Sequence, residues 1–199
     1  MVPLLDQPGF KKRVLPLSVK AWHQMVAKGL APARSELLRG VIVEKMSKSI
    51  LHTKLAGRLL QTLTESFGKV FWVRKEEPLT FADSEPEPDL SVVKGQEPDY
   101  VPHPETARLV IEVSVSTLLE DRELVSLYAE ALVDEYWIVN GRNREIEIYS
   151  RPVGGVYAEK TIVGLQGTAV SESLPGLEVS VSALFQGLTE LPVDEPGRN

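Results

Sequence analysis

The sequence predicts a mixed α/β domain, and two patterns support this fold class. Segments whose apolar residues recur at helical spacing alternate along the chain with short, strand-like apolar runs. A cluster of such runs, between residues 70 and 114, has predicted helices before and after it. The 199-residue chain is 43% hydrophobic and 25% charged, which suits one globular domain with a sizeable core.

The first half of the chain carries clear local signals. A serine N-cap opens a helix expected over residues 18–28, and residues 36–44 read as two short strands hinged at Gly40. A second helix is expected over residues 49–68, where leucines recur at helical spacing. His52 lies in its first turn, where a lone histidine is more often a surface or capping residue than a ligand.

The second half alternates strands with two helices. Thr117 is expected to cap a helix that runs to about Leu132, with Glu120 at capping-box spacing. A short last helix is expected over residues 180–185. Strands are predicted at residues 70–73, 79–81, 90–93, 109–114, 135–139, 145–149, 156–163 and 168–171.

Composition sets further bounds. We expect an irregular N-terminal arm at residues 1–17, a single domain at 18–190 and a flexible tail at 191–199. The net charge of −6 means that any contact with nucleic acid must come from a local patch. Cysteine is absent, and neither a membrane span nor a signal peptide is evident, so we expect a cytoplasmic protein without a membrane partner.

Two carboxylates occupy unusual places in the central strands. Asp89 opens one apolar run, and Glu112 interrupts a second run, residues 109–113, that is otherwise continuously apolar. Such a run is typical of a strand buried on both faces, where a glutamate needs a cation, a hydrogen-bond partner or a proton. The chain between the two carboxylates is long enough for a hairpin-like return, so we expect their strands to be neighbours.

Carboxylates on adjacent strands, about 4.8 Å apart, can share one cation. With no cysteine and only three histidines in the chain, oxygen ligands favour Mg²⁺ or Mn²⁺ over zinc. Such a metal activates water and neutralises charge on a phosphoryl oxygen, which suits phosphodiester hydrolysis. Glu36 can join from the early strand pair. The simpler alternative is that Asp89 is a turn residue after a proline and that Glu112 pairs with Arg108 or Arg122.

The residues around these carboxylates resemble a known fold. Pro88-Asp89, a strand and then Glu112-Val113-Ser114 resemble the PD-(D/E)XK pattern of restriction-endonuclease-like proteins. More narrowly, the chain from about residue 18 to residue 185 resembles the Uma-two family of endonucleases. The segments that carry this resemblance are 36–40, His52, 86–93, 109–114, 121–123, 128–131 and 135–140.

The resemblance implies a restriction-endonuclease-like mixed central sheet flanked by helices, with an additional β-rich C-terminal part. It also implies that Asp89, Glu112 and the Val113 carbonyl hold Mg²⁺ or Mn²⁺, with Glu36 as an accessory acid. The implied function is a metal-dependent endonuclease that hydrolyses phosphodiester bonds of DNA.

One departure from the pattern concerns a lysine. Ser114 stands where the wider fold has a catalytic lysine, and Leu124 stands where the Uma-two pattern places it, four residues before Tyr128. A leucine cannot orient the attacking water or stabilise developing negative charge. Arg122 is close enough in sequence to stabilise charge, but it cannot act as a base because it is nearly always protonated. The metal site is therefore expected to survive with weak or absent cleavage.

The candidate catalytic residues are Glu36, Asp89, Glu112, Ser114 and Arg122. The alternative to an enzyme is a non-catalytic member of the same fold that binds nucleic acid or a partner protein. A third alternative is a purely structural or oligomeric module, and a homodimer is left open.

Overall fold

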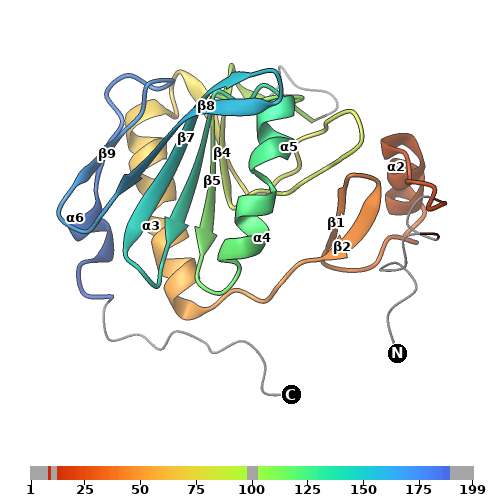
Figure 1. Ribbon diagram of the computed structural model, residues 1–199, viewed down its shortest axis with the longest axis horizontal. Coiled ribbons are helices and arrows are strands. Elements are labelled where there is room, and N and C mark those ends of the chain that lie inside the picture. Colours follow the sequence, from red (N-terminus) through yellow and green to blue (C-terminus); the bar gives the residue numbers. More distant parts are fainter. Residues whose placement is uncertain (1–8, 10–12, 98–102, 189–199) are drawn as a thin grey trace. The chain divides into compact units, whose positions relative to one another are not determined.

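The computed structural model describes residues 9, 13–97 and 103–188, and Figure 1 shows its helices and strands. The predicted tail at 191–199 and most of the predicted arm at 1–17 lie outside the described residues. The chain forms two compact units, one of residues 1–45 with 81–86 and one of residues 46–80 with 87–199. The predicted single domain over residues 18–190 stays a prediction.

The smaller unit contains helix α2 (Val19–Ala27) and a hairpin of strands β1 (Ser35–Leu38) and β2 (Val41–Glu44). The two-residue turn of the hairpin has positive φ at Arg39 (52°) and Gly40 (73°), as a type I′ turn requires. A Cβ atom at position 40 would lie 2.4 Å from Pro16 Cβ, so only glycine fits there. The predicted hinge at Gly40 is thus the tip of this hairpin.

The buried carboxylate of Glu85 ties the smaller unit together. Trp22 Nε1 donates to Glu85 Oε1 at 3.0 Å, and His23 Nε2 lies 2.5 Å from Glu85 Oε2. The backbone N–H of Glu85 donates to the Leu37 carbonyl of β1 at 2.6 Å. A single residue therefore connects α2 to the hairpin.

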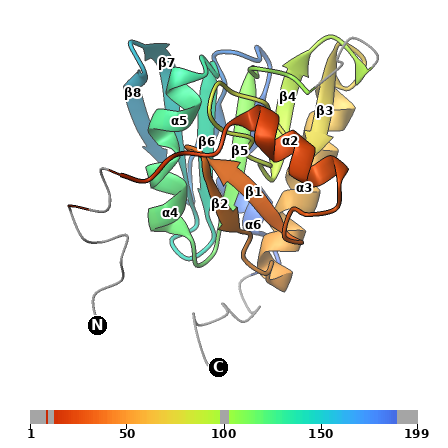
Figure 2. The ribbon, with the colours of Figure 1, turned by 90° about the vertical axis from the view of Figure 1, so that its right-hand side faces the viewer.

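The larger unit is built on a six-stranded sheet in the order β3-β4-β5-β6-β7-β8, and Figure 2 shows these strands side by side. Only β5 and β6 pair in parallel, because α4 and α5 form the crossover between them. The strands are β3 (Phe71–Lys75), β4 (Leu90–Lys94), β5 (Leu109–Ser114), β6 (Glu135–Asn140), β7 (Glu145–Val153) and β8 (Val156–Val163). The helices are α3 (Ile50–Phe67), α4 (Leu118–Glu123), α5 (Val125–Glu130) and α6 (Val181–Phe185). A separate strand pair joins β9 (Thr168–Val170) to β10 (Glu178–Ser180).

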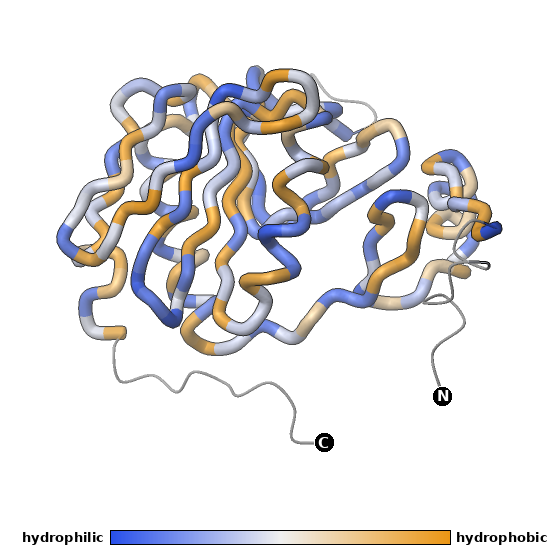
Figure 3. The backbone as a smooth tube through the Cα atoms, in the orientation of Figure 1, coloured by the Kyte–Doolittle hydropathy of each residue, from blue (hydrophilic) through white to orange (hydrophobic). Residues whose placement is uncertain are grey.

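The helices of the larger unit cover both faces of its sheet. Figure 1 shows α3 on one side of the strands and α4 and α5 on the other, and Figure 3 shows hydrophobic colouring along the central strands. Four leucines of α3 and the odd-numbered residues 109–113 of β5 belong to one buried cluster. Glu112 and its even-numbered neighbours point to the opposite face, because side chains alternate along a strand. The prediction that this strand is buried on both faces is confirmed.

Two predicted elements differ from the structure. Residues 79–81 form no strand: Leu79 is buried, but the segment follows Pro78. Its backbone bonds, from Thr80 N to the Pro104 carbonyl at 2.9 Å and from Phe81 N to the Ser84 carbonyl at 2.8 Å, belong to no strand ladder. The helix predicted after Thr117 is divided at Leu124 into α4 and α5. The Thr117 hydroxyl makes no helix-capping bond; it donates to Asp121 Oδ2 at 2.8 Å.

Candidate active site

Strand pairing brings Asp89 and Glu112 into contact. Asp89 directly precedes β4, and the antiparallel pairing of β4 with β5 sets Leu90 opposite Ile111. The backbone N–H of Asp89 donates to Glu112 Oε2 at 3.0 Å, and the N–H of Val113 donates to Asp89 Oδ2 at 2.8 Å. The two strands are therefore neighbours, as the sequence predicts.

The first turn of α3 supplies a further partner for Asp89. His52 Nε2 lies 2.8 Å from Asp89 Oδ2, and the His52 residue is only 8% exposed. The expectation of a surface histidine was therefore wrong. A sequence signal for burial was present, because His52, Leu55 and Leu59 lie on one helical stripe.

Lys48, just before α3, is shared between two carboxylates. Its Nζ atom lies 2.8 Å from Asp89 Oδ1 and 3.1 Å from Glu76 Oε1. Glu76 follows β3 in a left-handed conformation (φ 53°), and its N–H lies 3.2 Å from the carbonyls of both Pro88 and Asp89. A left-handed glutamate is strained, and such strain often accompanies functional sites. No local pattern in the sequence marks Lys48 or Glu76.

The charges of this cluster reinforce one another. Burial alone would raise the pKa of Asp89, but its interactions with His52 and with the ammonium group of Lys48 lower it to about 2. Burial alone would lower the pKa of Lys48, but the nearby charges and hydrogen bonds of Asp89 and Glu76 raise it above its usual 10.5. At neutral pH Asp89 is therefore a carboxylate and Lys48 an ammonium ion.

A tyrosine of α5, on the other side of the sheet from α3, forms a hydrogen bond with Glu112. The hydroxyl of Tyr128, a fully buried residue of α5, donates to Glu112 Oε1 at 3.1 Å. Each oxygen of Glu112 thus has at least one hydrogen-bond donor, Tyr128 for Oε1 and Asp89 N for Oε2. These bonds orient the carboxylate at the carboxyl-terminal part of β5.

Arg122 lies on the same sheet face but contacts a different carboxylate. The strand register aligns Glu112 with Ile138 of β6 and then with Glu147 of β7. Arg122 Nε lies 3.0 Å from Glu147 Oε1, so its partner is two strands, or about 10 Å, from Glu112. Arg108 binds Asp134 at 2.7 Å. The alternative in which Glu112 pairs with Arg108 or Arg122 is therefore wrong, because each arginine binds another carboxylate.

The other predicted site residues are placed as follows. Ser114 is buried in β5, on the same face as Glu112 because it is two residues further along the strand. Glu36 lies in β1 of the smaller unit, and its role as an accessory acid stays a prediction. Asp121 of α4 was not predicted as a site residue; burial raises its pKa to about 6, although the Thr117 hydroxyl bond opposes this shift.

The residues at Asp89 fit a hard divalent cation. Mg²⁺ is commonly held by one or two carboxylates, with waters and substrate phosphates completing the shell. Asp89 and Glu112 provide two carboxylates, and the Val113 carbonyl points to the Asp89 side because the N–H and C=O of a strand residue point the same way. Within residues 9, 13–97 and 103–188, no three His, Cys, Asp or Glu side chains gather as a larger metal site.

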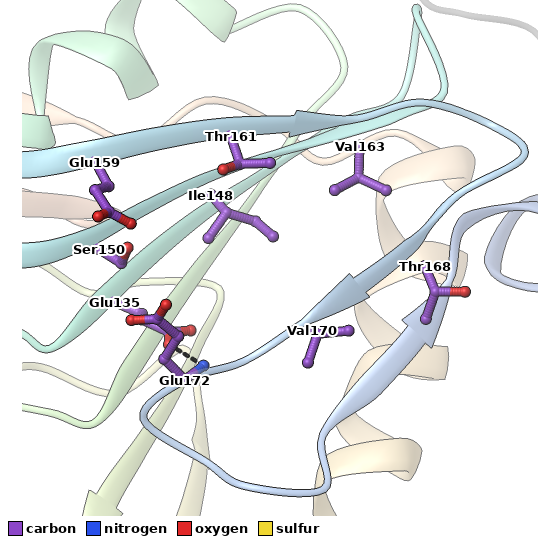
Figure 4. Close-up of a pocket in the computed structure, with 9 residues that line it drawn as sticks. All are labelled: Glu135, Ile148, Ser150, Glu159, Thr161, Val163, Thr168, Val170 and Glu172. Atoms are coloured by element: carbon purple, nitrogen blue, oxygen red, sulfur yellow. Dashed lines mark hydrogen bonds between the residues drawn. The ribbon is translucent and has the colours of Figure 1, made fainter.

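A separate pocket lies away from these residues. It has a volume of about 200 Å³. Figure 4 shows its lining: Glu135, Ile148, Ser150, Glu159, Thr161, Val163, Thr168, Val170 and Glu172. Glu135 Oε1 accepts hydrogen bonds from the backbone N–H groups of Glu172 and Ser173 at 2.5 and 2.7 Å, so its charge is already compensated. None of the candidate site residues lines this pocket.

The mixed sheet, its flanking helices and the paired acids of β4 and β5 define a restriction-endonuclease-like protein. The chain belongs to the Uma2 (Uma-two) family, because the family model described as "Putative restriction endonuclease" matches residues 24–182. This confirms the resemblance and the fold class predicted from the sequence.

A solved structure agrees with the family. A protein from Anabaena variabilis ATCC 29413, described as a putative nuclease belonging to DUF820, superposes with a TM-score of 0.72 at 15% identity. The match covers 85% of this chain and 98% of the other, and at this identity it concerns the fold. No curated protein matches the chain significantly. In the described parts of the chain, no helix is long and apolar enough to cross a membrane.

Proposed function

We propose that this chain is a Mg²⁺- or Mn²⁺-dependent endonuclease that hydrolyses phosphodiester bonds of DNA. The contact between Asp89 and Glu112 across β4 and β5 carries this proposal. Two acids on neighbouring strands, in a nuclease-like family, suit a divalent metal and a phosphate substrate. A cytoplasmic location and a homodimer remain predictions from the sequence.

The roles of the residues follow from their contacts. Asp89, Glu112 and the Val113 carbonyl would hold the metal, which when bound activates water and stabilises charge on a phosphoryl oxygen. His52 orients Asp89 and Tyr128 orients Glu112, through bonds of 2.8 and 3.1 Å. Arg122, on the same face and 38% exposed, suits contact with a neighbouring phosphate of the DNA backbone.

A nicking assay tests the proposal. Purified wild-type protein is expected to nick supercoiled plasmid DNA with Mg²⁺ and to lose this activity in EDTA. Asp89→Ala should fall to the background rate, because it removes one of two carboxylate ligands. Equal nicking by wild type and Asp89→Ala would indicate a contaminant and contradict the proposal.

A non-catalytic member that binds nucleic acid or a partner protein is the second candidate function. Leu124 is the observation that favours it, because an apolar side chain stands at the junction of α4 and α5. Tyr128 N donates to the Leu124 carbonyl at 3.1 Å, so the two residues lie one turn apart on one side of the helix. Tyr128 itself bonds to Glu112, which supports a position for residue 124 beside the proposed site.

We expect Leu124→Lys to raise Mg²⁺-dependent nicking about tenfold or more, since a positioned cation stabilises developing negative charge. Leu124 is only half-buried, so a lysine there can reach solvent without breaking the core. Metal affinity should change little. The matched control is Leu119→Lys, at a leucine of α4 that is 72% exposed. A folded Leu124→Lys protein that binds metal without gaining activity would exclude this role for the position.

A further inference from the structure

Lys48 places a positive charge at the proposed metal ligand Asp89. Its Nζ atom lies 2.8 Å from Asp89 Oδ1, while the other oxygen, Oδ2, is occupied by His52 and by the N–H of Val113. The ammonium group of Lys48 therefore contacts the carboxylate oxygen of Asp89 that has fewer protein partners. Arg122, the cation predicted from the sequence, is instead bound to Glu147.

Glu76 gives Lys48 a second anchor that does not depend on Asp89. Its Oε1 atom lies 3.1 Å from Lys48 Nζ, and its backbone is held by the carbonyls of Pro88 and Asp89. A divalent cation on Asp89 would repel an ammonium ion at the same carboxylate. Lys48 would then stay near the site through Glu76, with a side chain that is 29% exposed and so within reach of a ligand.

A structural ion pair explains Lys48 less well. Asp89 already has His52 and a backbone N–H as buried partners, so it does not need an ammonium ion to satisfy its hydrogen bonds. An ion pair of this kind is by itself weak support for stability, because taking the charges out of water costs much of the attraction. Phosphodiester hydrolysis, in contrast, gains from a fixed positive charge where negative charge develops.

We propose that Lys48 is a further catalytic residue, whose ammonium group, retained by Glu76, contacts the scissile phosphate and stabilises the charge that develops there. This inference rests on the proposed nuclease function. Water forms the new P–O bond, the bond to the leaving sugar oxygen breaks, and that oxygen takes up a proton that originates from the water. Lys48 stays protonated throughout and transfers nothing.

The test compares Lys48→Met, Lys48→Arg and a control, Lys54→Met, at an exposed lysine of α3, the helix that follows Lys48. Single-turnover nicking of plasmid DNA is measured at saturating Mg²⁺, with Mn²⁺ affinity by calorimetry and the melting temperature. Lys48→Met should slow nicking at least tenfold, with Mn²⁺ binding equal or tighter because a competing cation is gone. Lys48→Arg should recover part of the rate, and Lys54→Met should match wild type.

The possible results separate the two proposals. If wild type nicks DNA and folded Lys48→Met nicks equally fast at saturating metal, Lys48 only balances the charge of Asp89 and this inference is wrong. If Lys48→Met loses activity only because it melts below the assay temperature, Lys48→Arg decides the question. A folded Lys48→Arg protein that nicks no faster than Lys48→Met, although it keeps the positive charge, also overturns the inference. Absence of any metal-dependent nicking by wild type overturns the proposed function and this inference with it.

Discussion

Glu112→Gln is expected to reduce Mg²⁺-dependent nicking about 1,000-fold while the protein stays folded. Glutamine has nearly the same shape as glutamate, but it lacks the charge and one of the two acceptor oxygens. The Tyr128 hydroxyl and the N–H of Asp89 each donate to one carboxylate oxygen of Glu112. In the glutamine variant, only the donor that faces the new amide nitrogen loses its acceptor. The loss should therefore fall on metal binding and chemistry more than on stability.

The measurement pairs nicking rates with Mn²⁺ affinity and thermal unfolding. Glu123→Gln, at an exposed position at the end of α4, is the matched control and should behave as wild type. A Glu112→Gln protein that nicks within a few-fold of the wild-type rate would exclude Glu112 as a metal ligand. The oxygen ligands of the metal would then have to come from other residues.

Glu147→Gln is expected to lower the free energy of unfolding by about 2 kcal/mol at pH 7. The Glu147 side chain is fully buried and binds Arg122, Lys160 and the Tyr149 hydroxyl, the last two at 2.8 and 2.7 Å. Burial alone would raise the pKa of Glu147, but these partners lower it to about 2. The expected loss is below that of a fully buried pair, because Arg122 and Lys160 are 38% and 40% exposed.

The pH dependence of this effect has a definite sign. Because the pKa of Glu147 is about 2 in the folded protein and 4.5 ordinarily, its stabilising contribution is complete above pH 4.5 and is lost as the pH falls towards 2. Urea unfolding at pH 7 and at pH 3 should therefore show a smaller difference between wild type and Glu147→Gln at the lower pH.

The control for this experiment lies on the next strand. Glu159 of β8 pairs with Arg151 at 2.5 Å, but these side chains are 48% and 57% exposed. Glu159→Gln should change the free energy of unfolding by less than about 0.5 kcal/mol. A Glu147→Gln protein as stable as wild type at pH 7, or a difference that does not change with pH, would contradict the argument.

Much of the fold was predictable because its signals are local. The leucine stripe of α3, the apolar runs of β4 and β5 and the glycine turn of the first hairpin each need only neighbouring residues to be recognised. The strand predicted at residues 79–81 was wrong, because a short apolar run after a proline resembles a strand even where no partner strand pairs with it. The division at Leu124 has no breaker residue, so the periodic pattern alone predicts one continuous helix.

The amino-acid pattern alone placed Asp89 at the start of one central strand and Glu112 inside another, because a carboxylate beside or within an apolar run is conspicuous. The side chains that surround these two carboxylates could not be predicted from the pattern, because they come from distant parts of the chain. Lys48 and Asp89 are 41 positions apart, and Asp89 lies 37 positions from His52. Strand pairing and the packing of α3 bring these residues together, and both depend on contacts across the whole unit. A lysine before a helix and a glutamate after a strand are ordinary in sequence. They stand out only in the folded chain, where Lys48 Nζ lies 2.8 Å from Asp89 Oδ1 and 3.1 Å from Glu76 Oε1.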